Sequence, residues 1–173
     1  MFTIEVNVAD LEKALSRLEN AGEMRLSIMR GLGGVLLAAI ERGFREEADP
    51  VTGAVWAELS PVTQARRAKK GHAGKKLQVS GRLAASFGEA ELSETSVVVG
   101  SNVVYAPTMH YGAGKGAFGR MSILSTRREV PIPWGDIPAR PLLPIGENGE
   151  INSLDEEEIT EILQNNVRAV FSL

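Results

Sequence analysis

The stretch LSIMRGLGGVLLAAIERGF, residues 26–44, decides the fold class because its apolar residues recur at the spacing of one helix face. That face consists of Ile28, Leu32, Val35, Leu36, Ile40 and Phe44. A shorter stripe of leucines precedes it, so we predict two consecutive helices or one bent helix over residues 10–48. The helical region should end at Asp49-Pro50, since proline disfavours helix at the residue before it.

Three glycines, Gly31, Gly33 and Gly34, lie inside this helical stretch. Each should cost up to about 1 kcal/mol relative to alanine in a helix interior. Close approach of another helix or another subunit would offset that cost, and a local break in the helix is an equal alternative.

Local signals elsewhere predict a small sheet and further helices. Strands are predicted at residues 2–8, 87–92, 96–100 and 130–133, with residues 103–105 extending the sheet. The second and third of these runs should pair as an antiparallel hairpin. Ser60-Pro61 should begin a helix, because serine caps and proline suits the first turn, and residues 80–86 should form a short helix or turn.

The C-terminal part should close the domain with a helix. Ser153-Leu-Asp-Glu156 has the form of a capping box, and the apolar face behind it is Ile159, Ile162, Leu163, Val167 and Val170. Residues 112–128 are rich in glycine and basic groups, which predicts a long mobile loop. We therefore predict a single α+β domain over residues 1–173: N-terminal helices packed on a small, mainly antiparallel β-sheet, with a long basic glycine-rich loop and a C-terminal helix.

Composition excludes several classes of protein. The chain has no cysteine, so disulfides, thiolate catalysis and zinc-finger sites are excluded. The acidic start lacks the pattern of a signal peptide, and the longest apolar run, residues 35–40, is far shorter than the roughly 20 residues of a membrane span. We predict a soluble chain that acts without a membrane.

The formal net charge of −3 hides a strong asymmetry. Residues 59–88 contain no acid but seven basic groups, Arg66, Arg67, Lys69, Lys70, Lys75, Lys76 and Arg82. Residues 147–161 contain seven acids and no basic group. A solvated helix start favoured by the helix dipole is the simplest interpretation of the acids, and a basic partner surface is the alternative.

No pattern of catalysis or cofactor binding is present. Gly114 to Gly119 has dinucleotide-loop spacing, but no strand leads into it and no helical stripe follows it. His72 should be solvated, and His110 is more simply a hydrogen-bonded structural histidine than a general base of a small hydrolase. We predict no catalytic residue, no cofactor and no metal.

The basic segments, residues 66–82 and 115–128, allow two kinds of partner. Lysine and arginine release counterions from phosphates, which would make the chain a nucleic-acid-binding module. Stacking aromatics are absent from residues 66–82, and an acidic protein subunit, including the acidic helix of another copy, fits equally well.

Four motifs, taken in order, carry a family resemblance. They are Asp49-Pro-Val-Thr-Gly-Ala-Val-Trp56 with Leu59-Ser-Pro-Val-Thr63; Leu77-Gln-Val-Ser-Gly-Arg-Leu83 with Ser86; Val99-Gly-Ser-Asn-Val-Val-Tyr-Ala106 running to His110-Tyr-Gly112; and Ile137-Pro-Ala-Arg-Pro-Leu-Leu143. Together they resemble the phage virion morphogenesis (tail completion) family of Mu-like and P2-like phages and prophages, over roughly residues 10–146.

The resemblance implies a structural role in completing tails or joining heads to tails, with no catalytic centre to transfer. It implies a homo-oligomer such as a ring, other phage neck or tail proteins as partners, and work in the host bacterial cytoplasm or as a virion component. Trp56 should anchor the core or an interface, and Arg140 should be a fixed ion-pair donor. The candidate interface residues are Trp56, Arg66, Arg67, Lys69, Lys70, Lys75, Lys76, Arg82, Lys115, Arg120, Arg127, Arg128 and Arg140.

Overall fold

The computed structural model describes residues 21–72, 74–118, 120–123, 128–131, 136–146 and 148–171. Its longest element is helix α2, Ala21–Glu46, which ends just before Asp49-Pro50 as predicted. The predicted strand at residues 2–8 and the first helical stripe lie outside the described residues.

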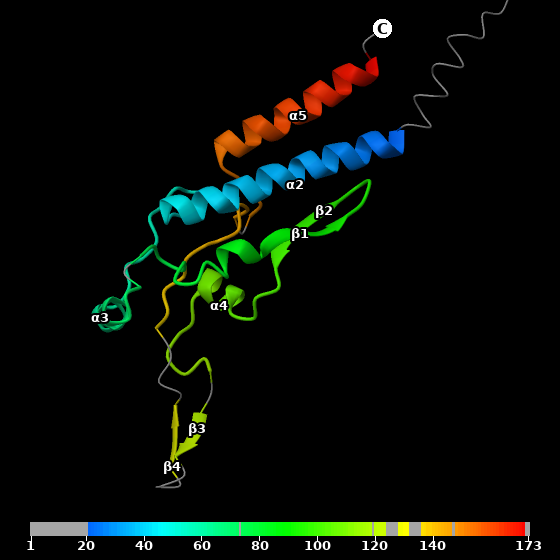
Figure 1. Cartoon of the computed structure of the whole chain (residues 1–173). Coiled ribbons are helices and arrows are strands. Elements are labelled where there is room, and N and C mark those ends of the chain that lie inside the picture. The colour runs from blue at the N-terminus through cyan, green and yellow to red at the C-terminus, as the bar shows by residue number, and fades with distance from the viewer. Residues whose placement is uncertain are drawn as a thin grey trace, which may run out of the picture.

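Helix α2 is the middle layer of the fold. Figure 1 shows the C-terminal helix α5, Ser153–Phe171, on one side of it. The hairpin of β1, Phe87–Leu92, and β2, Val97–Ser101, lies on the other side. The hairpin pairs antiparallel, as predicted, with a register shift between Glu89 and Glu91. The α+β class is therefore confirmed.

The three glycines of α2 singled out in the sequence differ in whether a neighbouring element requires them. The helix runs through them unbroken, so the predicted alternative of a local break is wrong. A Cβ atom on Gly31 would lie 3.4 Å from the Ile162 side chain of α5, and one on Gly33 would lie 2.9 Å from Val97 of β2. A Cβ atom on Gly34 would meet nothing within 4 Å, and no contact in the described chain requires a glycine there.

The core forms at the C-terminal end of α2. Ile40 and Phe44 pack there with five buried residues from other segments, Trp56, Leu83, Val103, Ala106 and Leu142. The Trp56 ring meets Phe44 edge-on at a centroid distance of 5.5 Å, and its indole N–H donates to the Pro141 carbonyl at 3.0 Å. Trp56 is only 3% exposed, which confirms it as a core anchor.

Two short helical elements lie next to buried residues of the core. Leu83 precedes the 3-10 turn η1, Ala84–Ser86, in the segment predicted to be a short helix or turn. Residues 103–105 do not extend the sheet; they lead into helix α4, Ala106–Tyr111. The physical reason is Pro107, whose fixed φ and missing N–H suit the first turn of a helix.

The segment predicted as one long loop contains a strand. Arg120–Ile123 forms β3 and pairs antiparallel with β4, Arg128–Pro131. These four-residue runs form a second two-stranded sheet. The extended segment predicted at residues 130–133 is confirmed in part, because residues 132–135 lie outside the described chain.

Helix α5 begins as predicted but with a different cap. The side-chain oxygen of Asn152 accepts the Leu154 N–H at 3.0 Å, so Asn152 rather than Ser153 caps the helix. Asparagine is as good a cap as serine, and it also binds the Val51 carbonyl at 3.2 Å, which ties the helix start to the core segment.

Candidate assembly interface

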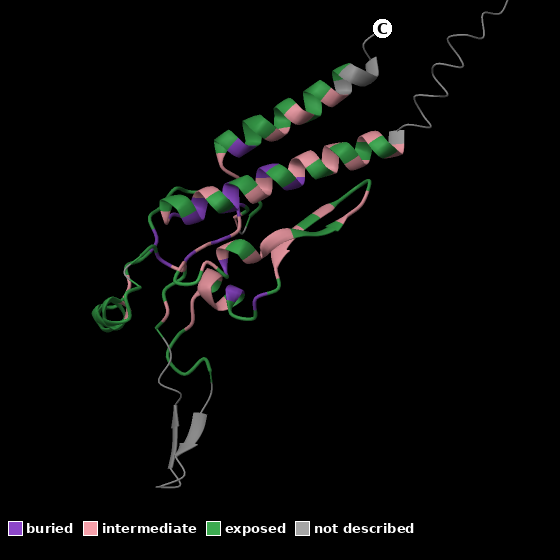
Figure 2. Ribbon diagram, viewed as in Figure 1, coloured by how far each residue is buried: buried purple, intermediate pink, exposed green. Residues whose placement is uncertain are grey.

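Helix α3, Pro61–Lys69, stands apart from the layered body (Figure 1). Ser60 caps it by accepting the Thr63 N–H at 3.3 Å, and Pro61 fills the first turn, as the sequence predicts. None of its residues is buried, and Figure 2 shows it exposed along its length. A nine-residue helix is marginal in water without packing, so α3 has a surface that a partner can stabilise. We call residues 60–70 the α3 arm.

The outward side of the arm is a basic stripe. Val62, Arg66 and Lys69 recur at helical spacing and therefore share a face, and Lys70 follows directly. Val62 is 69% exposed, and the three cations are exposed as well. Among the residues that the structure describes, no side-chain hydrogen bond or ion pair involves these three cations. They remain available to a partner.

The base of the arm is held by two buried cations. Lys76 is 6% exposed and donates to the Trp56 carbonyl at 3.0 Å, and it pairs with Glu58 at 2.7 Å. Arg140 is 4% exposed and donates to the carbonyls of Ala57, at 2.9 Å, and Glu58, at 3.2 Å. Three consecutive carbonyls thus accept from charged donors, which fixes the direction in which the chain leaves the body.

The pKa shifts of Arg140 and Glu58 agree with these contacts at the base of the arm. Burial lowers the pKa of the Arg140 guanidinium from its ordinary value, although the charge of Glu58 opposes the shift. The hydrogen bond from Lys76 lowers the pKa of the Glu58 carboxyl. Among the described residues, the hydrogen bonds of Arg140 go to main-chain carbonyls of residues 57, 58 and 138 and no ion pair involves it, so its predicted ion-pair role stays a prediction.

The end of the arm is tied down in the same way. Arg67 donates to the carbonyls of His72, Gly74 and Lys75, at 3.1, 3.0 and 2.9 Å. Lys75 in turn donates to the Arg45 carbonyl at the end of α2, at 2.7 Å. These two cations organise the loop that returns from α3 to the body.

The structure therefore divides the predicted interface residues into two groups. Trp56, Arg67, Lys75, Lys76 and Arg140 serve the fold, whereas Arg66, Lys69, Lys70, Arg82 and Lys115 are exposed cations. The side chains of Arg120, Arg127 and Arg128 lie outside the described part. Sequence reasoning could not separate the groups, because the carbonyls that attract the inward cations come together only in the fold.

The acidic helix start is also divided. Asp155 is 2% exposed and pairs with Arg42 of α2 at 2.6 Å, so it is not part of a solvated helix start. That hydrogen bond raises the pKa of Arg42. The other acids of the first two turns, Glu156, Glu157, Glu158 and Glu161, are exposed. A shallow hollow on this outer side is lined by Ser153, Glu156, Glu157, Thr160, Glu161 and Gln164.

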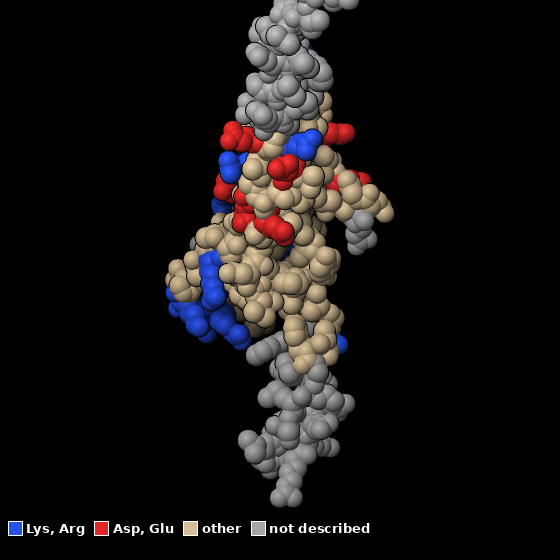
Figure 3. Space-filling view, turned by 90° about the vertical axis from the view of Figure 1, so that its right-hand side faces the viewer, with Lys and Arg blue, Asp and Glu red and all other residues tan. Residues whose placement is uncertain are grey.

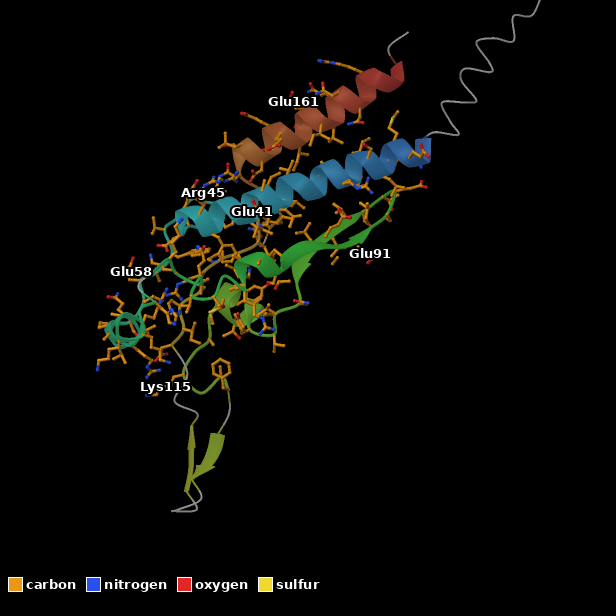
Figure 4. All side chains as sticks on the ribbon, in the orientation of Figure 1. Glu41, Arg45, Glu58, Glu91, Lys115 and Glu161 are labelled. Atoms are coloured by element: carbon orange, nitrogen blue, oxygen red, sulfur yellow. The ribbon has the colours of Figure 1, made fainter. Side chains whose placement is uncertain are left out.

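The two charge groups lie on separate parts of the surface. Figure 3 shows a cluster of lysine and arginine side chains at one end of the body, whereas the acids lie over the other part, together with a few further basic side chains. In Figure 4, Glu161 lies on α5, whereas Lys115 lies toward the opposite end of the molecule. The predicted charge opposition is thus present in three dimensions.

His110 has a structural role in the core region. Its Nδ1 accepts the Leu142 N–H at 2.9 Å, which requires the neutral ring, and its ring meets Tyr111 edge-on. Burial lowers its pKa, while Asp49 opposes that shift. Sequence reasoning preferred a hydrogen-bonded structural histidine to a general base, and this hydrogen bond is the kind of contact that the preferred interpretation expects.

Two kinds of feature are absent from the described residues. Within them, no three side chains of His, Asp or Glu lie together as a metal site requires. No helix in the same ranges is long and apolar enough to cross a membrane.

Comparison with known proteins gives the identity of the family. The model of the phage virion morphogenesis family matches residues 6–168. The "Putative capsid assembly protein G" of Escherichia phage Mu is 29% identical over 153 residues, which cover 88% of each chain. No solved structure matches. The exposed arm and the opposed charges therefore belong to a member of the phage virion morphogenesis family.

Proposed function

We propose that this protein is a non-enzymatic assembly factor that completes the phage tail or joins heads to tails during virion morphogenesis. The observation that carries the proposal is the α3 arm, which has no buried residue and a fixed base. A helix that is held at its two ends yet unpacked along its length is suited to docking on another protein. Its partners are other phage neck or tail proteins and further copies of the chain, met in the host bacterial cytoplasm.

The relative in phage Mu bears a name that refers to the capsid, so the stage of assembly needs a direct test. In a phage that carries this gene, the gene is deleted and the lysate is examined by electron microscopy. DNA-filled heads beside separate, finished or unfinished tails would support the proposal. Empty or aberrant capsid shells would contradict it and favour a role in building the capsid.

Complementation ties the function to the arm. A plasmid copy of the gene should restore infectious particles, and the Arg66→Glu, Lys69→Glu, Lys70→Glu variant should not. Arg30→Glu is the matched control, because Arg30 is exposed and basic but lies on α2, outside the candidate interface residues. Full titre from the arm variant would contradict docking through α3.

A further inference from the structure

We infer that the basic stripe of the α3 arm docks onto the outer acidic side of α5 in a second copy of the chain. The inference rests on the proposed function and names the surfaces through which copies associate. Because one patch meets a different patch, the contact is heterologous, and repetition of it gives a ring or a filament.

The surface that contributes the cations is one narrow face of the α3 arm. Arg66 and Lys70 are one turn apart, about 6 Å along the helix axis. Val62 lies one turn before Arg66 and adds an exposed apolar group to the same stripe. The described residues of the same chain make no side-chain ion pair with these cations, so the arm is not neutralised by its own body.

The surface that contributes the acids, on the outer side of α5, repeats at the same spacing as the cations of the arm. Glu157 and Glu161 are also one turn apart, again about 6 Å, and Gln164 continues the row. This row lies on the side of α5 opposite Asp155 and Ile162, which contact α2. It therefore faces solvent in the single chain and is open to a neighbour.

Helix direction favours an antiparallel arrangement. The cations crowd toward the C-terminal end of α3, and the acids crowd toward the N-terminal end of α5. Placing these two ends together pairs Lys70 with Glu157 and Arg66 with Glu161. The two helix macrodipoles then point in opposite directions, which is the favourable arrangement. Val62 then lies against the Gln164 turn.

A protein partner fits the arm better than DNA does. Proteins that bind single-stranded nucleic acid without sequence preference commonly combine cations with aromatic platforms, and residues 57–72 contain no aromatic side chain except the imidazole of His72. An apolar valine within the stripe also suits a helix surface more than a phosphate backbone.

The test uses two charge-reversed variants of the full chain. The arm variant is Arg66→Glu with Lys70→Glu, and the α5 variant is Glu157→Lys with Glu161→Lys. Solution mass is measured by light scattering across protein concentration and salt, with and without duplex DNA. The matched controls are Arg30→Glu and Glu91→Lys, which reverse exposed charges outside both stripes and outside the candidate interface residues.

The native chain should associate reversibly and dissociate as salt is raised. Each variant alone should have a dissociation constant at least about tenfold higher, because like charges then face each other. An equimolar mixture of the two variants should associate again, since each acidic arm meets a basic α5 and each basic arm meets an acidic α5. Both controls should behave like the native chain.

Three outcomes would overturn the inference. They are unchanged association of the arm variant, no recovery in the mixture, and a native chain that is monomeric throughout but binds DNA through Arg66 and Lys70. The deletion micrographs remain separate from this test. Unjoined heads and tails together with any of these outcomes would leave the assembly role standing and reject only this contact.

Discussion

Helices α3 and α5 are both charged surface helices, but they are attached to the body in opposite ways. Helix α5 packs along α2 and buries one of its acids, Asp155, against Arg42. In the described part of the chain, helix α3 has no buried residue and is held at its two ends, by Lys76 and Arg140 on one side and Arg67 on the other. The difference shows that the charged residues of a surface helix cannot be assigned to a binding surface until those that face the body are identified.

Breaking the anchor of α5 should have the largest effect. Arg42→Ala leaves the Asp155 carboxylate buried without its partner, which should lower the free energy of unfolding by about 3 kcal/mol. Chemical denaturation followed by circular dichroism measures the change. Glu156→Ala, one residue away and exposed, is the control and should shift stability by less than about 0.5 kcal/mol. Equal effects would mean that Asp155 is hydrated after all.

Removing the cation at the base of α3 should have a smaller effect on the whole fold. Arg140→Ala leaves the carbonyls of Ala57 and Glu58 without their donor, which should cost about 2 kcal/mol. Arg140→Lys should recover part of that loss, because one ammonium reaches fewer carbonyls than the guanidinium fork. A stability unchanged in Arg140→Ala would show that the base is held without this residue.

Lowering the pH should reduce the free energy of unfolding through His110, which lies in the body and not in the α3 arm. The pKa of His110 is lowered by burial, so the unfolded chain takes up a proton on this ring before the folded chain does. The stabilising contribution of the neutral ring is complete above the unfolded pKa of about 6.5 and is lost as pH falls through the folded pKa. Urea midpoints at several pH values measure this loss.

The control for the acid effect is His110→Gln, which cannot take up that proton. Its urea midpoint should fall less steeply than that of the native chain below pH 6.5. If both proteins respond identically, protonation of His110 does not cause the acid sensitivity.

The smallest global effect should come from the cap of α3. Ser60→Ala removes the acceptor for the Thr63 N–H and should weaken the helix locally by about 1 kcal/mol. Because no residue of α3 is buried, the global unfolding free energy should change by less than about 0.5 kcal/mol. Hydrogen exchange should instead show faster exchange in residues 63–69 alone. Faster exchange throughout the body would contradict an independent arm.

The sequence predicted those parts of the fold whose signals are local. Ser60-Pro61 carries both the cap and the first-turn proline of α3, and residues 87–100 carry the strand pattern of the hairpin. Residues 103–105 were predicted wrongly because proline is compatible both with the end of a strand and with the start of a helix. Only the packing of Val103 and Ala106 into the core separates the two.

The sequence predicted which segments carry the basic residues of the candidate interface, but not which of those residues face solvent. Lys75, Lys76, Lys69 and Lys70 are indistinguishable in sequence, yet the first two bind carbonyls of distant residues and the others face solvent. Asp155 likewise differs from Glu156 only because Arg42 lies beneath it. Such distinctions depend on contacts across twenty or more residues, which no local pattern contains.

The use of main-chain carbonyls at the base of α3 has a consequence for evolution. Every amino acid at position 57 presents the same carbonyl group to Arg140, so substitutions there can accumulate while the direction of the helix is kept. Glu58 and Arg140 do not have this freedom, because the Glu58 carboxylate also pairs with Lys76 and Arg140 is the donor. The direction of α3 is therefore set by the main chain and a few charged groups, and it does not depend on the side chain at position 57.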